Sequence, residues 1–499
     1  MIDRLIHGHA TRWAAGALLL LLGACSVAPS YERPHVHTPE RFKEAAVTDR
    51  WKTAEPADDR QRGEWWTLFN DPVLNDLERQ AAEANQNLKA AAARVLQARA
   101  ESSAARASRF PTLDAGFGPT RERLSPASQF QSDSAHVPTQ TLWRAQATAS
   151  YEADLFGRVS ESVNAAVADQ AQQEALFHSV QLALQADVAR NYFELREYDN
   201  QLRLYQRTVA LREDTLKLVE ARFKEGDISE LDDARARHEL FAARADSSGV
   251  ARLRAASEHS LAVLLGQAPA EFGLAPSPLE PVRMQVPDVM PSELLERRPD
   301  IAAAERGMAA ANARIGLAKS AFFPRLVING AGGFEAGSLG NLFDWSTRAF
   351  VLGPLTGTAL TLPLFDGGRR QADLDAARAQ YEEDVARYRE QVLIAFREVE
   401  DSLSDLRLLE EQSRDQNTAV SASQRTERLS KKQYEEGQIS YLDVIDAQRQ
   451  VLQTELQLSR LTGVQAAATV NLVRALGGGW ARGGEERGGE SVVMRSEAR

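Results

Sequence analysis

The residues of this chain best placed to do chemistry are two aspartates in its second half. Asp443 and Asp446 stand three positions apart, so on a helix both carboxylates lie on one side. Two carboxylates held on one side attract cations and repel anions. The plainer interpretation is that both begin a helix, where the macrodipole favours carboxylates and Ser440 can act as the cap.

No other residues are grouped as a catalytic or metal site requires. His35 and His37 could bind a metal together, but no further ligand accompanies them. No Ser/His/Asp grouping, phosphate-binding loop or Cys/His cluster occurs at useful spacing, and Cys25 is the single cysteine. The sequence therefore predicts neither an enzyme nor a cofactor. A net charge of −11 also argues against nucleic acid as a partner.

The second half of the chain repeats the first. The segment around Gly437 matches the one around Gly226, and other pairs of residues recur in the same order. These pairs are Leu265-Gly266 with Leu476-Gly477, and Phe110-Pro111 with Phe323-Pro324. One structural unit is therefore built twice, and the two glycines mark the reversal of long helices, because φ > 0 is easiest for glycine. The position that matches Asp446 in the first half is occupied by Arg235, so a need shared by both turns does not explain the Asp446 carboxylate.

The chain begins with the pattern of an export signal. Arg4 and Arg12 supply basic charge, and the apolar segment 14–22 is too short to span a bilayer as a helix. The signal ends in Leu-Gly-Ala-Cys25, which resembles the lipobox of bacterial lipoproteins. That resemblance implies that Cys25 is lipidated, and Ser26 after it implies delivery to the outer membrane. The alternative is an ordinary signal peptide with a chance cysteine.

Residues 142–155 alternate apolar and polar side chains without an error. A half-buried strand of a soluble sheet gives the same pattern. The export signal, the length of the segment and the aromatic residues Trp143 and Tyr151 near its ends favour a transmembrane barrel strand. Weaker strand patterns cover 112–118, 325–334 and 356–365. Four strands cannot close a barrel, so either they form a soluble sheet or several chains combine.

Each predicted hairpin is followed by a very long helix. Between Gly157 and Phe223 no Gly or Pro occurs, and such a helix would reach roughly 100 Å. Two apolar series, each repeating every seven residues, lie about 200° apart on it. They are Leu195, Leu202, Val209, Leu216 and Phe223, and Leu204, Leu211 and Leu218. This helix needs neighbours on two sides, as in the wall of a tube.

These patterns divide the chain into segments. The predicted order is a signal peptide (1–24), a lipidated arm (25–70), a first repeat (71–266), a linker (267–291), a second repeat (292–477) and a disordered tail (478–499). The hairpins are predicted at about 111–155 and 324–365, and the helix-reversing tip turns at about 224–231 and 435–442. The arm is predicted to be extended, with Trp51, Trp65 and Trp66 available for docking.

This combination of features resembles the TolC-type outer-membrane efflux channels, especially their OprM-like lipoprotein branch. The resemblance covers roughly residues 60–477. The matching phrases are Arg298-Pro-Asp-Ile-Ala-Ala-Ala-Glu305, Phe323-Pro-Arg-Leu326, Pro363-Leu-Phe-Asp-Gly-Gly-Arg369 and Tyr441-Leu-Asp-Val-Ile-Asp-Ala-Gln448. Their order and spacing, rather than any single phrase, carry the match.

The resemblance implies a mainly helical homotrimer in the outer membrane. Three chains of four strands would close a twelve-stranded β-barrel, continuous with a long periplasmic α-helical barrel. The implied partners are outer-membrane lipid, a periplasmic adaptor (membrane fusion) protein and an inner-membrane RND-type pump, with passive transport of drugs or other small molecules. Asp443 and Asp446 would form acidic rings at the tip constriction, with Tyr434 helping to hold it closed. Where TolC carries a tip-locking arginine, this chain has Ile439.

Two other functions compete with the efflux channel. The outlet of a type I protein-secretion system would share the architecture, because cargo choice lies in the pump. A structural coiled-coil lipoprotein of the envelope belongs to a different class. The alternation at 142–155 argues against a structural coiled-coil lipoprotein, because such a protein does not need a long amphipathic strand bearing Trp143 and Tyr151.

Overall fold

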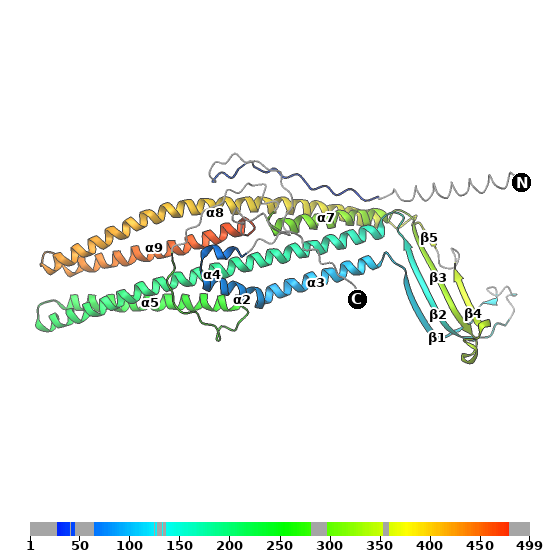
Figure 1. The fold of residues 1–499 in the computed structure, drawn as a ribbon, viewed down its shortest axis with the longest axis horizontal. Helices are drawn as coiled ribbons and strands as arrows, with labels where there is room; N and C mark the ends of the chain where they lie inside the picture. Colours follow the sequence, from blue (N-terminus) through cyan, green and yellow to red (C-terminus); the bar gives the residue numbers. More distant parts are fainter. Residues whose placement is uncertain are drawn as a thin grey trace, which may run out of the picture. The chain divides into compact units, whose positions relative to one another are not determined.

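The computed structural model describes residues 27–39, 41–44, 64–123, 125–126, 132, 136–280, 297–352 and 359–478, and it is mostly helical (Figure 1). The chain divides into two compact units. The first comprises 1–35, 94–173 and 303–388, and the second comprises 36–93, 174–302 and 389–499. Each unit therefore takes segments from both repeats. Cys25, Trp51 and the tail beyond residue 478 lie outside the described residues.

The first unit contains one antiparallel sheet, in the order β1-β2-β3-β4 with β5 also paired to β3. The strands are β1 (Thr112–Glu122), β2 (Gln140–Ala153), β3 (Arg325–Ala336), β4 (Arg348–Leu352) and β5 (Ala359–Thr361). β4 pairs with Gly330–Phe334 of β3, and β5 pairs with Arg325–Val327. The two short strands thus occupy one strand position beside β3, and each half of the chain supplies one hairpin.

The bounds predicted for the last strand, 356–365, agree with the described residues only at 359–361. Strand pairing already begins at Arg348 and ends at Thr361, within the described residues. Residues 362–365 lie in no strand. Pro363 gives a physical reason, because a proline has no N–H to donate to a strand partner.

Successive side chains of a strand point to opposite faces of the sheet, and residues paired across strands point to the same face. Because apolar and polar residues alternate along β2, the sheet has one apolar and one polar face. On the apolar face Phe117 stands opposite Ala145, and its ring centroid lies 6.0 Å from that of Trp143. On the polar face the Arg144 guanidinium meets Glu335 at 2.8 Å. The alternation seen in the sequence therefore separates two chemically different surfaces.

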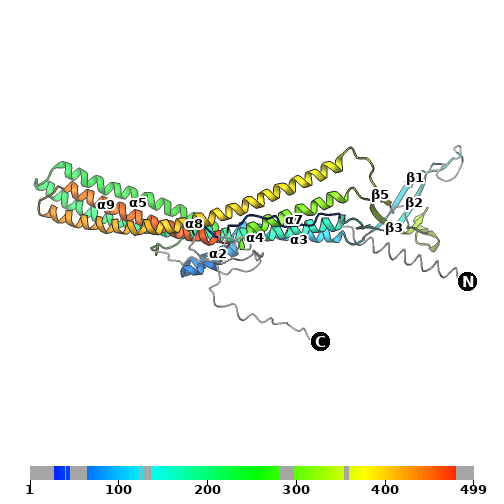
Figure 2. The ribbon, with the colours of Figure 1, turned by 90° about the horizontal axis from the view of Figure 1, so that it is seen from above.

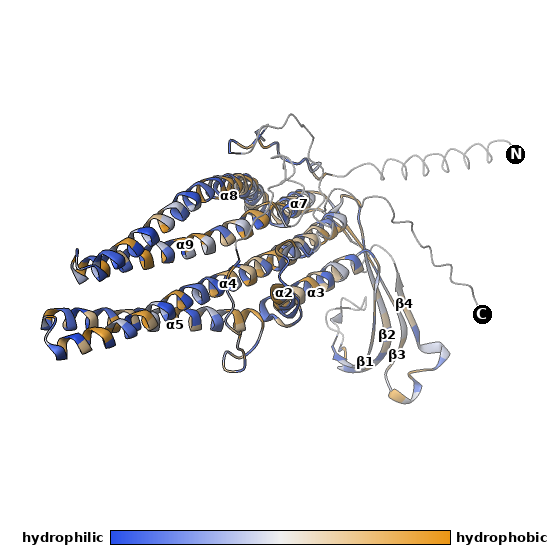
Figure 3. Ribbon diagram, turned by 60° about the vertical axis from the view of Figure 1, so that its left-hand side comes forward, coloured by the Kyte–Doolittle hydropathy of each residue, from blue (hydrophilic) through white to orange (hydrophobic). Residues whose placement is uncertain are grey.

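The helices repeat in length between the two halves. They are α2 (Pro72–Ala84), α3 (Gln86–Ala107), α4 (Arg158–Glu225), α5 (Glu230–Leu264), α7 (Pro299–Ser320), α8 (Arg369–Glu435) and α9 (Tyr441–Ala475). α4 and α8 have 68 and 67 residues, and α5 and α9 have 35 each, which gives two matching hairpins (Figure 2). Polar and apolar residues are interspersed along them (Figure 3). None of the described helices carries an apolar stretch long enough to cross a membrane.

The core of the second unit includes two tryptophans that were predicted to lie in an extended arm. Trp65 and Trp66 instead form a short 3-10 helix, η1 (Trp65–Phe69), and are 3% and 7% exposed. The indole N–H of Trp65 donates to Gln185 of α4 at 3.1 Å. They pack in one cluster with buried residues of α2, α4, α5 and α9. The tryptophans therefore dock inside their own chain.

The described part of the arm from Val36 onward and the described part of the linker both belong to the second unit. Phe42 of the arm is 2% exposed, and its ring centroid lies 6.4 Å from that of Phe396 on α8. Glu44 of the arm bonds Arg407 of α8 at 2.8 Å. The linker is held by Arg196 of α4, whose guanidinium donates to the carbonyl of Ala275 at 2.7 Å. Side chains of the long helices thus hold both connecting segments.

Candidate functional site

The two helix reversals of the second unit carry most of the residues selected from the sequence (Figure 2). Gly226 and Gly437 have φ of +81° and +73°. In the second turn the Gly437 N–H donates to the carbonyl of Tyr434 at 2.9 Å, and the next N–H donates to Gln433 at 2.8 Å. This is the Schellman pattern, which requires a left-handed residue after the helix. A Cβ at either glycine would meet nothing within 4 Å, so backbone conformation rather than space favours glycine.

Asp443 is committed to the start of its own helix. Its Oδ2 accepts from the Ser440 backbone N–H at 3.0 Å and from the Ser440 hydroxyl at 2.7 Å. These bonds hold the pKa of the Asp443 carboxyl below its usual range. In the first repeat the Ser229 hydroxyl makes the equivalent bond to Asp232 at 3.0 Å. The helix-start interpretation therefore accounts for the local contacts of Asp443.

Asp446 makes a different set of contacts. Its Oδ1 lies 3.2 Å from a guanidinium nitrogen of Arg449, and its side chain is 60% exposed. The residue at the matching position, Arg235, instead pairs with Asp232 at 3.6 Å. The two repeats thus present opposite charges at one position of the same turn.

Tyr434, near the end of α8, contacts both hairpins. Its ring centroid is 5.7 Å from that of Tyr441, at the start of α9. The Arg222 guanidinium, near the end of α4, donates to the Tyr434 hydroxyl at 3.5 Å. Burial raises the pKa of Tyr441 to about 12, so this phenol stays neutral at physiological pH.

Sequence reasoning missed a buried ionic cluster beside the turns. Glu239 of α5 meets Arg212 of α4 at 2.9 Å, and their side chains are 8% and 9% exposed. The Nε of Arg449 on α9 also donates to Glu239, at 3.0 Å. Burial lowers the pKa of Arg212 despite the adjacent carboxylate. Arg449 therefore connects the exposed Asp446 of one hairpin with the buried Glu239 of the other.

The repeat itself held a signal for this cluster. The positions of α8 and α9 that match Arg212 and Glu239 are occupied by Ser423 and Gln450, which are uncharged. A charge present in one repeat and absent from the other is not needed to build the hairpin. Arg449, three residues after Asp446, was a second local signal.

The remaining selected residues lie elsewhere. Trp143 and Tyr151 are partly exposed on the apolar face of β2, opposite Ala336 and Ile328 of β3. His35 and His37 are exposed in the arm. Among the described residues, no group of three or more His, Cys, Asp or Glu is close enough to hold a metal ion.

The chain belongs to the outer membrane efflux protein family, whose model matches residues 77–267 and 290–478. It is 34% identical to the outer membrane protein OprJ of Pseudomonas aeruginosa, over 95% of this chain and 98% of that protein. It is 33% identical to the toluene efflux pump outer membrane protein TtgC of Pseudomonas putida, over 92% and 94%. The resemblance seen in the sequence is confirmed, and the chain is an outer-membrane efflux channel protein, from a family of transporters rather than enzymes.

Solved structures agree with this assignment. The outer-membrane channel OprN matches with a TM-score of 0.82 at 28% identity, over 91% of this chain and all of that one. The open state of the MtrE outer membrane channel of Neisseria gonorrhoeae matches with a TM-score of 0.78 at 30% identity, over 91% and 98%. Both therefore share the fold of this chain over most of its length.

Proposed function

We propose that three copies of this chain form a passive exit duct from the periplasm to the outside. The observation that carries the proposal is the sheet. Among the described strands, β1 pairs only with β2, and β4 and β5 pair only with β3, so both edges are available for pairing. An open strand edge cannot be exposed to lipid, and three such sheets joined edge to edge would close a twelve-stranded barrel. The apolar face, with Trp143 and Tyr151, would then face the membrane.

The long helices support the same assembly. Leu195, in the first apolar series of α4, is fully buried within the chain. Leu211 and Leu218 of the second series, and Phe223 at the end of the first, are 41%, 54% and 41% exposed. Apolar side chains in a regular helical series require a neighbour, and a second copy of this chain would provide one. Three helix sets would enclose a periplasmic tube.

The tips of the hairpins are proposed to close this tube. Three copies of Asp443 and Asp446 would place six carboxylates at the constriction, which would favour cations over anions. Tyr434, bonded to Arg222 of the other hairpin, would help to hold the tips together. The chain has Ile439 where TolC carries its tip-locking arginine, so closure here depends on other contacts.

The proposed partners are those of a tripartite pump. The relatives include the antibiotic efflux pump outer membrane protein ArpC and the toluene efflux pump outer membrane protein TtgC, both of Pseudomonas putida. By this similarity the duct would receive small molecules from an inner-membrane RND-type pump through a periplasmic adaptor. A lipid at Cys25 would anchor the arm in the outer membrane.

Reconstitution in a planar bilayer tests the duct. The purified full-length protein is expected to form channels that prefer cations, because carboxylates line the constriction. Reversal potentials under a KCl gradient measure this preference. Complete absence of conductance, with the protein shown to be inserted and trimeric, would refute the proposal.

The lipid anchor has its own test. Changing Cys25 to serine is expected to abolish incorporation of labelled fatty acid, because the lipid is attached to the cysteine sulfur, which a serine hydroxyl does not replace. Labelled palmitate and gel analysis of the membrane fraction would measure it, with the unchanged protein as control. Undiminished labelling of the serine variant would exclude Cys25 as the attachment site.

A further inference from the structure

In each repeat, a side chain that precedes an early helix binds the end of the last helix of that repeat. Asn85 directly precedes α3, and its amide donates to the carbonyl of Leu264, the last residue of α5, at 2.8 Å. Arg298 directly precedes α7, and its guanidinium donates to the carbonyl of Ala475, the last residue of α9, at 3.1 Å. A helix end leaves carbonyls without intrahelical partners, so both side chains satisfy the same need. Asn85 shows that a neutral donor is sufficient.

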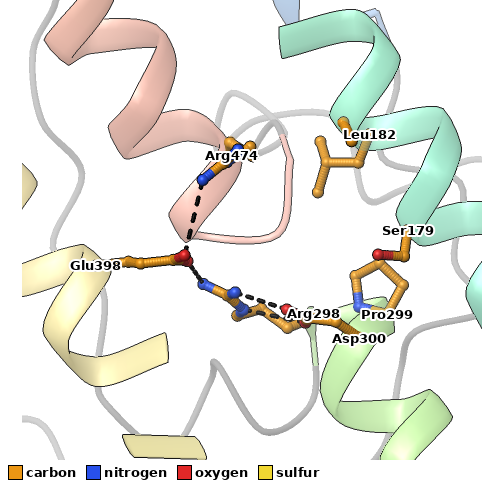
Figure 4. A pocket seen from close by; sticks show the side chains of 8 residues that line it. Ser179, Leu182, Arg298, Pro299, Asp300, Glu398 and Arg474 are labelled. Atoms are coloured by element: carbon orange, nitrogen blue, oxygen red, sulfur yellow. Dashed lines mark hydrogen bonds and ion pairs between the residues drawn. The ribbon is translucent and has the colours of Figure 1, made fainter. Parts of the chain in front are cut away.

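Arg298 makes further contacts that Asn85 does not match. It meets Asp300 at 2.6 Å and Glu398 of α8 at 2.6 Å (Figure 4). Arg474 of α9 approaches the same Glu398 at 3.6 Å. The Arg298 side chain is only 7% exposed, and the group lines a cavity of about 220 Å³ within the second unit. We name Arg298, Asp300, Glu398 and Arg474 the charged clamp.

The first repeat lacks this clamp. Asp187 occupies the position of α4 that matches Glu398 on α8. It pairs with Arg190 of its own helix, and both side chains are well exposed, at 39% and 44%. The position matching Arg474 is Val263, which is 63% exposed. Closing a repeat therefore does not require charge, and the clamp is a property of the second hairpin alone.

The clamp holds both helices of that hairpin to one residue. Arg298 reaches α8 through Glu398 and α9 through the carbonyl of Ala475. The far end of the same hairpin carries Asp443 and Asp446. A change in the angle of α8 and α9 at their base would move these carboxylates by a larger distance at the tip. Charge-assisted hydrogen bonds from the buried Arg298 guanidinium resist such a change, because they are stronger than neutral hydrogen bonds.

We propose that the charged clamp is a positioning device that holds the second hairpin, and with it the constriction, in its closed arrangement. The proposal rests on the proposed function of the tips as a gate. Arg298 and Glu398 are positioning residues, since neither lies at the constriction. Their loss changes how often the tips open, rather than which ions the tips prefer.

Glu398→Gln is the decisive variant. Glutamine has the shape of glutamate and still accepts from Arg298, while Asp300 continues to neutralise the buried guanidinium. We expect a folded trimer whose open fraction in a planar bilayer rises roughly tenfold, as replacing a charge-assisted hydrogen bond by a neutral one would give. Uptake of a large antibiotic by cells carrying the variant is expected to rise as well. Asp187→Asn, the same chemical change at the matching position of α4, is the control and is expected to alter neither quantity.

Cation preference separates this proposal from the proposed function. If the unchanged protein conducts with cation preference and Glu398→Gln opens no more often than Asp187→Asn, the clamp does not position the gate. If the unchanged protein does not conduct at all, the duct itself is refuted. Where Glu398→Gln lowers the melting temperature strongly, Arg298→Gln supplies a second variant, because it keeps a donor for Ala475. A closed channel in that folded variant would also overturn the proposal.

Discussion

Replacing Glu239 by alanine is expected to destabilise the hairpin tips by about 3–5 kcal/mol, the cost of breaking a buried ion pair from one side. The variant leaves Arg212 buried without its carboxylate, and burial already disfavours the charged form of this guanidinium. It also releases Arg449, which joins α9 to α5 through Glu239. Hydrogen exchange in α5 and α9, compared with exchange in the sheet, measures the local effect.

Glu455→Ala is the matched control for that experiment. Glu455 of α9, whose side chain is 14% exposed, also pairs with an arginine of α4, Arg207, but this guanidinium is 66% exposed and stays hydrated when the carboxylate is removed. Removing Glu455 therefore leaves no buried charge unpaired, and a smaller change than in Glu239→Ala is expected. Replacing Arg212 and Glu239 together by methionines should restore much of the stability, because no buried charge then remains. Equal exchange rates in Glu239→Ala and Glu455→Ala would show that the buried cluster contributes no more to the stability of α5 and α9 than the pair of Glu455 with Arg207.

The elements of this fold were predictable because they depend on local patterns. A long helix without Gly or Pro, a change of period at the strands and a glycine at each reversal are all visible over short stretches of sequence. Gly226 and Gly437 have the positive φ that the turn requires. Family membership followed from the order of such features, and the relatives confirm it.

Contacts between distant segments were not predictable in this way. Trp65 and Trp66 precede the first long helix in a stretch with little periodicity, so nothing local indicates that they are buried. Arg449 and Glu239 sit on different hairpins, 210 residues apart in the chain, and their pairing depends on how the hairpins pack. The last strand was misplaced because its two pieces pair with separate parts of β3.

Comparison of the two repeats recovers part of that missing information. Positions that are equal in both copies, such as Ser229 and Ser440 before α5 and α9, serve the geometry of the turn. Positions at which only one copy is charged mark contacts specific to one hairpin. Glu239 at the tips and Arg298 at the base both meet this criterion, and both join elements that the repeat alone would leave unconnected.

Asp446→Asn is expected to reduce the cation preference of the channel more than Asp443→Asn. Each change removes three carboxylates from the proposed trimer. Asp446→Asn also removes the exposed carboxylate that pairs with the Arg449 guanidinium, so the positive charge of Arg449 is less neutralised near the constriction. Reversal potentials of the two variants in the same KCl gradient measure the difference. Equal cation preference in both variants and the unchanged protein would remove the two aspartates from the pore.

Stability distinguishes the roles of the two residues further. The lowered pKa of Asp443 means that its capping bonds stabilise the fold above the unfolded pKa of about 3.9 and are lost as pH falls through the lower folded value. The cap and its charge are therefore present at pH 5.

Asp443→Asn should loosen the turn at pH 5 and pH 7 alike, seen as faster hydrogen exchange at the start of α9, because an amide accepts less strongly from Ser440. Asp446→Asn should leave that exchange unchanged, since the bonds between Ser440 and Asp443 are intact. Faster exchange in both variants would mean that Asp446 also supports the turn, and its carboxylate would then need no function in the pore.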